Sequence, residues 1–295
     1  MRWATYLPPH AGHNRHMVLR YAAFTTDPAT GNPAGVVLDA TGLTDSDMQR
    51  IAKEVGYSET AFAVATADRR FDVRYFSPLA EVPFCGHATI ATAVALAERD
   101  GTGDLVFTTK AGEIPVRTDD QGAIVASLVS VPTHSRPATP DELGRALTAL
   151  RWPAEDVDPA WPPHVAFAGN DHLVLAAATR DRLANLDYDF EALKALMHDR
   201  NWTTVQLFWP ENDHTMHARD PFPVGGVVED PATGAAAAAF GGYLRALGQV
   251  PTPRRIAIVQ GEDMGRRSEL TVDVDPEDPR VTVTGTATRI TESER

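Results

Sequence analysis

Apolar residues cluster most densely in two similar stretches of the chain, residues 81–96 and 229–244. In each stretch a turn containing proline leads to a glycine, which opens a run of small and apolar residues. The two stretches begin 148 residues apart and share Glu, Pro, Gly, Ala, Ala and Leu at matched positions. A helix without a polar face is buried on all sides. The pattern therefore predicts two buried central helices, one in each half of a duplicated chain.

These two predicted helices begin at Gly86 and Gly234. The first backbone N–H groups of a helix lack partners within the helix and carry partial positive charge, so a helix start can hold an anion. We therefore expect the two halves to face one negatively charged ligand.

Most of the other apolar residues occur in short β-rich runs, several of them alternating, as half-buried strands do. Strands are predicted at residues 18–24, 35–38, 61–64, 71–75, 105–109, 114–117, 123–126, around 165, 173–175, 205–208, 216–219, 256–259, 270–274 and 281–284. Outer helices are predicted at 44–55, 139–150 and 189–198, the first two with N-cap signals. Each half thus contains several strands, at least one outer helix and one apolar helix, which favours sheets wrapped around a buried helix over alternating βαβ units.

The elements divide into two domains, residues 18–132 and 133–280, with a Pro-rich linker at 131–140. The last strand, near residues 281–290, is expected to return to the first domain. Residues 1–17 are polar and contain proline and histidine, and we expect them to form a flexible leader.

The chain has 295 residues and a formal net charge of −13. This acidic excess argues against nucleic-acid binding, which needs clustered Lys and Arg, and against binding to an anionic membrane surface. No apolar run is long enough to cross a bilayer. The single cysteine, Cys85, allows no intramolecular disulfide, which fits a reducing cytoplasm.

The sequence contains no dinucleotide fingerprint, phosphate loop, nucleophile elbow or zinc-ligand spacing. We therefore expect no cofactor and no metal. His10, His13 and His16 in the leader are spaced by three and could bind a metal, but a flexible tail is the favoured interpretation.

Five short segments contain most of the residues that indicate a protein family. They are Gly31-Asn32-Pro33, Ser58-Glu59-Thr60, Pro83-Phe84-Cys85-Gly86-His87, Glu229-Asp230-Pro231-Ala232-Thr233-Gly234 and Gln260-Gly261-Glu262. In this order and spacing, the chain resembles the PhzF family of phenazine-biosynthesis isomerases over residues 18–286. The resemblance implies an α+β fold of two pseudo-symmetric diaminopimelate epimerase-like domains. Each would be a mostly antiparallel β-barrel around a central helix, with the active site between the domains. Members of the family commonly form homodimers.

The resemblance also implies three catalytic residues. Glu59 corresponds to the general acid/base of the family, which moves a proton between carbons. His87 follows the glycine of the first central helix and would donate to the substrate or shuttle a proton; the alternative is a histidine bonded to backbone. Asp230 would contact the substrate, often its amino group, although an N-cap role fits the sequence equally well.

Substrate binding is expected at Ser58, Asn32, Gly86, Gly234 and Ala235. The two glycines would let a substrate carboxylate approach the helix starts. Phenazine-type members usually have Ser at the position of Ala235, where it donates to that carboxylate. The alanine removes this donor and puts the phenazine substrate itself in question.

Cys85 matches the position of one of two catalytic thiols in the related epimerases, and its counterpart in the second half is Thr233. A racemase with two thiols needs a second cysteine, which this chain lacks. We therefore expect Cys85 to be a small packing residue.

The leading hypothesis is a cytoplasmic, cofactor-independent isomerase of secondary metabolism that acts on a small unsaturated amino acid or cyclic carboxylate. Phenazine-type and alkylproline-type precursors are both candidate substrates. The alternatives are an amino-acid epimerase or racemase and a non-catalytic protein that binds a small carboxylate. A homodimer is expected, and nucleic-acid or membrane partners are not.

Overall fold

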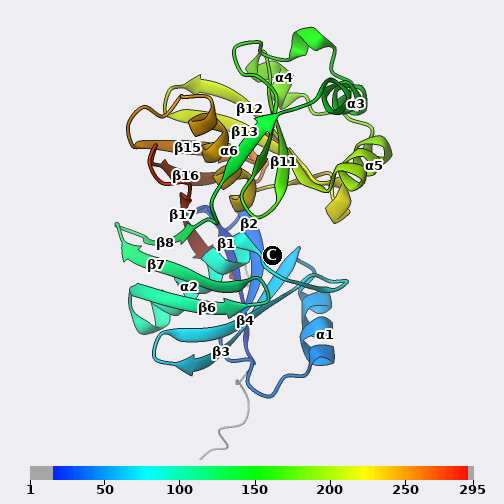
Figure 1. Cartoon of the computed structure of the whole chain (residues 1–295). Coiled ribbons are helices and arrows are strands. Elements are labelled where there is room, and N and C mark those ends of the chain that lie inside the picture. Colours follow the sequence, from blue (N-terminus) through cyan, green and yellow to red (C-terminus); the bar gives the residue numbers. More distant parts are fainter. Residues whose placement is uncertain (1–15, 292–295) are drawn as a thin grey trace, which may run out of the picture.

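Residues 16–291, which the computed structural model of the protein describes, fold into two lobes with one central helix each (Figure 1). The first lobe contains β1 (Val18–Ala23), β2 (Asn32–Val37), α1 (Asp45–Val55), β3 (Glu59–Ala67), β4 (Arg70–Phe76), β5 (Glu81–Val82), α2 (Gly86–Asp100), β6 (Gly103–Thr109), β7 (Gly112–Asp120) and β8 (Ile124–Val129). The second begins with β9 (His134–Pro137), α3 (Pro140–Leu150), η1 (Ala154–Asp156), β10 (His164–Phe167), β11 (Asp171–Ala176), α4 (Arg180–Ala184), α5 (Phe190–Arg200) and β12 (Trp202–Asn212). It continues with β13 (Thr215–Pro221), η2 (Pro223–Gly225), β14 (Glu229–Asp230), α6 (Gly234–Ala246), β15 (Arg254–Gln260), η3 (Glu262–Met264), β16 (Ser268–Val274) and β17 (Val281–Arg289).

The two lobes repeat the same order of strand pairings. In the first lobe β1 and β2 are antiparallel, β2 and β3 parallel, β3 and β4 antiparallel, β4 and β6 parallel, and β6 to β8 antiparallel. The strands from β10 to β17 follow the same sequence of pairings, with α6 in the place of α2. The predicted fold of two pseudo-symmetric, mostly antiparallel units is therefore confirmed.

The last strand, β17, holds the lobes together. It pairs with β8 and β1 and so closes the first barrel, while its first residues also pair with β16 of the second lobe. One strand thus belongs to both sheets, and this limits how far the lobes can separate. The domain boundaries near residues 132 and 280 stay a prediction.

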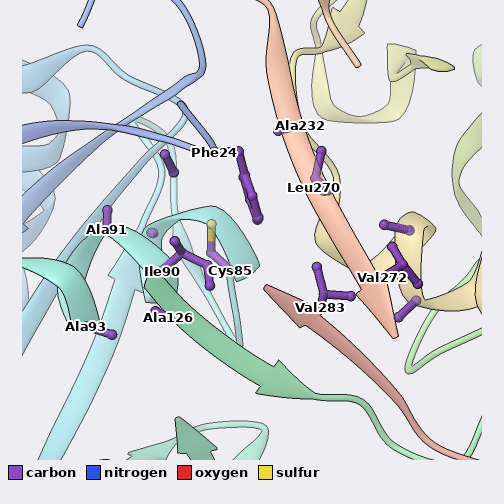
Figure 2. Close-up of a cluster of buried hydrophobic side chains, with 14 of the residues drawn as sticks. Phe24, Cys85, Ile90, Ala91, Ala93, Ala126, Ala232, Leu270, Val272 and Val283 are labelled. Carbon is purple, nitrogen blue, oxygen red and sulfur yellow. The ribbon is translucent and has the colours of Figure 1, made fainter. Parts of the chain in front are cut away.

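The central helices are buried as their sequences predict. Every residue of α2 from His87 to Ala97 is buried, and so is every residue of α6 from Ala236 to Leu244. Small side chains let the barrel walls approach both helices. The apolar side chains around them form one cluster that runs through both lobes, in which Cys85 and Ile90 lie near Phe24, and Leu270 and Val272 come from the second lobe (Figure 2).

The shared glutamate of the two repeated stretches has a structural role. Glu81 on β5 accepts two hydrogen bonds from Arg74, and Glu229 on β14 accepts two from Arg219. Each pair fastens the short strand that leads into a central helix. The glutamate that is repeated in the sequence therefore supports both helix starts in the same way.

Three features of the second lobe differ from the sequence prediction. The predicted linker contains β9, which pairs with β10 despite its flanking prolines. The short helix α4 was not predicted, because five residues offer too little periodicity. The second lobe therefore has three outer helices, α3, α4 and α5, instead of the two that were predicted.

Other predicted features are present. Thr44 caps α1 in a capping box and Gly56 ends it with a φ of 73°. Within residues 16–291, no helix is both long and apolar enough to cross a membrane. The leader prediction for residues 1–17 falls almost entirely outside the described residues.

Candidate active site

The starts of the two central helices meet at the junction of the lobes. A Cβ atom added to Gly86 would lie 3.9 Å from the Cα atom of Gly234. Both glycines are half-buried, so this meeting point is not sealed inside the core. Two positive helix ends therefore face the same small volume.

Neither of these helix starts has a side-chain cap. The N-cap residues, Cys85 for α2 and Thr233 for α6, make no side-chain hydrogen bond to the helix. Each of the other α-helices in residues 16–291 has a threonine or aspartate cap that accepts from a backbone N–H. The unpartnered N–H groups are thus concentrated where the two lobes meet, as an anion site requires.

Protein packing alone does not explain the glycines at these two positions. A Cβ atom on Gly234 would meet nothing closer than Phe24 at 3.9 Å, which is an ordinary contact. Neither Gly86 nor Gly234 has a positive φ. The missing side chains leave room beside the helix starts, which supports the prediction that a ligand approaches there.

Glu59 lies beside the start of α2. It is the first residue of β3, and its side chain is 18% exposed. Its Oε2 atom is 3.5 Å from Nε2 of His87, and the same His87 nitrogen is 3.3 Å from Oγ of Ser58. Within residues 16–291, the polar contacts of the His87 ring are with the side chains of Ser58, Cys85 and Glu59, which does not support the alternative of a backbone-bonded histidine.

Cys85 is buried, as expected for a packing residue, but it also contacts the polar side chains of Glu59 and His87. Its sulfur is 3.6 Å from Oε2 of Glu59 and 3.4 Å from Nδ1 of His87. Burial, followed by the charge of Glu59, raises the pKa of the Cys85 thiol well above its usual range. The thiol is therefore held protonated, as a weak donor to Glu59 and a poor base.

Asp230 lies at the start of α6 and completes the site from the second lobe. Its carboxylate accepts a hydrogen bond of 2.8 Å from Asn32 Nδ2 and one of 2.6 Å from Thr233 Oγ1. Its side chain does not cap the helix, so the N-cap interpretation was wrong. Burial raises the pKa of Asp230, and the nearby charges of His87 and Glu59 act in opposite directions on it.

Asn32 and Gln260 position Asp230 and the neighbouring start of α6. Asn32 is buried and donates to Asp230 and to the carbonyl of Ala232, so its amide is used within the protein. Gln260 accepts from the backbone N–H of Thr233 and donates to the carbonyl of Asp230. The role of Gln260 was missed, although its segment was among those that carried the resemblance.

The site brings three possible metal donors together. Donor atoms of Glu59, Cys85 and His87 lie within 4.8 Å of one another. Sequence spacing did not predict this group, because Glu59 comes from a different element. A metal would need the Cys85 thiolate, which its buried position disfavours. Of the leader histidines, only His16 is described, and its Nδ1 contacts the carbonyl oxygen of Asp39.

A separate groove, lined in part by β8, β16 and β17, contains none of the eight predicted site residues. All eight lie instead at or beside the helix starts. Ser58 immediately precedes β3 and Glu59 is its first residue, Asn32 is the first residue of β2, and Ala235 is the half-buried second residue of α6.

Comparison with known proteins identifies the family. A family model for PhzC-PhzF, described as phenazine biosynthesis-like protein, matches residues 21–293. The chain belongs to the PhzC-PhzF family. An uncharacterized isomerase, YfhB, from Bacillus subtilis (strain 168) is 31% identical to the chain, and the alignment covers 92% of this chain and 95% of YfhB.

Two further proteins place the chain within the PhzC-PhzF family. The trans-2,3-dihydro-3-hydroxyanthranilate isomerase of Pseudomonas aeruginosa is 31% identical, over 86% of this chain and 89% of its own. A PhzF-family phenazine biosynthesis protein from Bacillus anthracis has a crystal structure similar to this one, with a TM-score of 0.83 and 28% identity. The match covers 93% of this chain and 96% of the B. anthracis chain. Relatives of the chain are thus named isomerases, and its fold is that of the PhzC-PhzF family.

Gly234 and Gly241 offer a matched test of the open helix start, because both belong to α6. We expect Gly234→Ala to weaken the binding of a small aromatic carboxylate, measured by calorimetry, at least about tenfold, because the methyl group enters the free space. The free energy of unfolding should change by less than about 1 kcal/mol, since alanine suits a helix at least as well as glycine.

Gly241→Ala serves as the control. Its Cβ atom would lie 2.9 Å from Val274 and 3.0 Å from Val281. Overpacking of this kind costs about 1–3 kcal/mol of stability, while carboxylate binding by the folded fraction should be unchanged. Equal binding by Gly234→Ala and the unsubstituted protein would contradict the anion site.

Proposed function

We propose that the protein is a cofactor-independent isomerase that moves a proton between two carbons of a small unsaturated amino acid or cyclic carboxylate. Glu59 is the general acid/base. The proposal rests above all on one observation: the Glu59 carboxylate lies beside His87 at one uncapped helix start, while Asp230 lies at the other.

The uncapped N–H groups of α2 and α6 would hold the substrate carboxylate. Asp230 is half-buried and accepts only from Asn32 and Thr233 among the described side chains, so one face of its carboxylate can receive an ammonium or amino group. Carboxylate and amino group together would place the carbon skeleton in front of Glu59. Holding the reacting carbon next to the base in this way is itself a large part of catalysis.

The reaction needs no oxidant or reductant. The Glu59 carboxylate removes a proton from an sp³ carbon, and the bonding electron pair enters the conjugated system of the substrate. Glu59, now a carboxylic acid, returns the proton to another carbon of that system. His87, within reach of both Glu59 and Ser58, would donate a hydrogen bond to the charge that develops between the two steps.

The relative from P. aeruginosa indicates the chemical class of substrate. The compound in its name carries a carboxylate, an amino group and two conjugated ring double bonds, which match the three recognition elements proposed above. Ala235 offers no hydroxyl to the carboxylate. We infer that this chain relies on backbone N–H groups alone there, and that its own substrate is a related precursor of secondary metabolism, of phenazine or alkylproline type. Trans-2,3-dihydro-3-hydroxyanthranilate is the probe substrate in the tests below.

An epimerase with two thiols is the main alternative, and the N-caps argue against it. Cys85 and Thr233 occupy equivalent N-cap positions on α2 and α6. A threonine hydroxyl that donates to Asp230 cannot act as a second thiol base. The other alternative, a non-catalytic binding protein, would retain the anion site but show no turnover of any substrate of this class.

We further propose that the protein acts as a homodimer in the cytoplasm, on a small carboxylate and without nucleic acid or membrane partners. The net charge of −13 supports the exclusion of nucleic acid. Sedimentation analysis at micromolar concentration would test the dimer, and a monomeric species alone would refute it.

Glu59→Gln should lower turnover of the probe substrate about 10²–10⁴-fold, the usual contribution of a general acid/base. Cys85→Ala should change turnover by less than about fivefold, because its thiol only supports Glu59. Steady-state kinetics of both variants provide the comparison, with circular dichroism to confirm that each is folded. An inactive Cys85→Ala protein beside an active Glu59→Gln protein would reverse the assignment and favour the epimerase.

Removal of metal ions should leave turnover unchanged, since the proposed chemistry uses none. We expect the same rate after dialysis against a chelator. Excess Zn²⁺ should inhibit by occupying Glu59, Cys85 and His87, and Cys85→Ala should weaken that inhibition. Activity that is lost on chelation and restored by one metal ion would contradict the metal-free mechanism.

A further inference from the structure

Three connecting segments from distant parts of the chain meet beside the start of α6. They join β1 to β2, β14 to α6, and β15 to β16, at residues 24–31, 231–233 and 261–267. The first segment belongs to the first lobe and the other two belong to the second. Three polar side chains, those of Asn32, Gln260 and Arg266, each link two of the segments. The segments therefore form one unit, the three-turn cluster.

Two of the links lead to the segment that carries Asp230. Asn32, directly after the first segment, donates to the Asp230 carboxylate at 2.8 Å and to the carbonyl of Ala232 at 3.1 Å. Gln260, directly before the third segment, donates to the Asp230 carbonyl at 2.8 Å and accepts from the N–H of Thr233 at 3.1 Å. The position of Asp230 thus depends on where the first and third segments lie.

Arg266 makes the remaining link, between the first and third segments. Its Nε atom donates to the carbonyl of Gly31 at 2.8 Å, and its two terminal nitrogens donate to Thr30 at 2.9 Å and Ala29 at 3.4 Å. A planar guanidinium directs its N–H groups in a fixed fork, so one side chain can hold three successive carbonyls. The carbonyl of Gly31 belongs to the planar peptide group that leads into Asn32. Holding this carbonyl therefore fixes the backbone from which Asn32 starts.

The half-buried Arg266 side chain is committed to this segment. All of its hydrogen bonds found within residues 16–291 go to the three carbonyls, and none of the salt bridges found there includes it. Its neighbour Arg267 differs, because it pairs with the carboxylates of Glu262 and Glu269 in its own part of the chain. The two adjacent arginines thus have separate roles, and only the side chain of Arg266 joins the lobes.

Glycines at two positions let the segments of the three-turn cluster pack closely. Gly31 has a φ of 68°, and a Cβ atom there would lie 2.4 Å from Cγ2 of Thr25. Gly261 has a φ of 73°, and a Cβ atom there would lie 2.8 Å from the carbonyl oxygen of Pro231. Positive φ and lack of space both favour glycine. The third segment is therefore packed directly on the segment that enters α6, so a displacement of one shifts the other.

We propose that Arg266 is a positioning residue of this site: it holds the β1–β2 connection in the place from which Asn32 orients the Asp230 carboxylate toward the substrate's amino group. Among the described side chains, only Thr233 would still donate to this carboxylate if Asn32 moved away. The amino-group contact rests on the proposed function, whereas the link through Arg266 does not.

Hydrogen exchange measured by mass spectrometry tests the link without substrate. Arg266→Gln should speed amide exchange at least about fivefold in residues 24–31 and also in residues 231–234, which its own hydrogen bonds do not reach. Arg267→Gln makes the same chemical change one residue away and keeps the backbone bond from Gly31, so it should leave both segments unchanged. Faster exchange in residues 24–31 alone would overturn the proposal.

Kinetics with the probe substrate test the positioning role. Arg266→Gln should raise KM at least about tenfold and lower kcat less than about threefold, because it disturbs substrate binding and leaves the proton transfer by Glu59 intact. Arg267→Gln should change neither value more than about twofold. A lower free energy of unfolding in Arg266→Gln with an unchanged KM would show a purely structural role and overturn the proposal.

A double-mutant cycle tests whether Arg266 acts through Asn32. We compare Arg266→Gln, Asn32→Ala and the doubly substituted protein. If the arginine acts through the asparagine, KM of the double variant should lie within about twofold of the larger single effect, because the second change removes nothing further. Effects on KM that multiply would show that the two residues act independently and would contradict the proposal.

Arg266→Lys keeps the charge but cannot follow three carbonyls with one ammonium group. It should change exchange and KM in the same direction as Arg266→Gln, and it decides the question if the glutamine variant does not fold. Exchange and KM equal to those of the unsubstituted protein would show that a charge is sufficient and would overturn the proposal. An unsubstituted protein that does not turn over the probe would count against the proposed function, while the exchange result would stand.

Discussion

Two helix starts that point at each other are the constraint on which the rest of this structure depends. Aligned peptide dipoles place partial positive charge at the beginning of α2 and of α6, and the two barrels bring Gly86 and Gly234 into contact distance. Like charges at this distance repel. Acidic side chains beside each start, Glu59 and Asp230, offset the repulsion, each interaction of this kind contributing about 0.3–1 kcal/mol. The same arrangement attracts an anionic ligand.

The supports for this arrangement come from outside the site. Strand β17 belongs to both sheets and prevents the lobes from separating. The Arg74–Glu81 and Arg219–Glu229 pairs fasten the short strands that enter the two helices. The site itself is asymmetric despite the symmetric frame. The first lobe contributes the groups that can move a proton, whereas the second contributes the carboxylate of Asp230, which is held by hydrogen bonds from Asn32 and Thr233.

Much of this was predictable because the signals are local. Runs of small apolar residues predicted both central helices, and their repetition predicted the paired lobes. The motif resemblance predicted that Glu59, His87 and Asp230 belong to one site. What was missed depends on contacts between distant segments. The contacts of Cys85 with Glu59, and those of Gln260 with Thr233 and Asp230, join segments that are far apart in the sequence, so no periodic pattern predicts them. Strand β9 was hidden by prolines, which an edge strand can accommodate.

Solvent exchange during turnover tests the central claim most directly. The probe substrate is converted in D₂O, and the product is analysed by NMR and mass spectrometry. If Glu59 carries a proton between two carbons and exchanges it with solvent on the way, deuterium should appear at the carbon that gains the proton and at no other, and the double bonds should shift. Deuterium at the carbon that loses the proton, with inverted configuration and unmoved double bonds, would contradict the account and identify an epimerase.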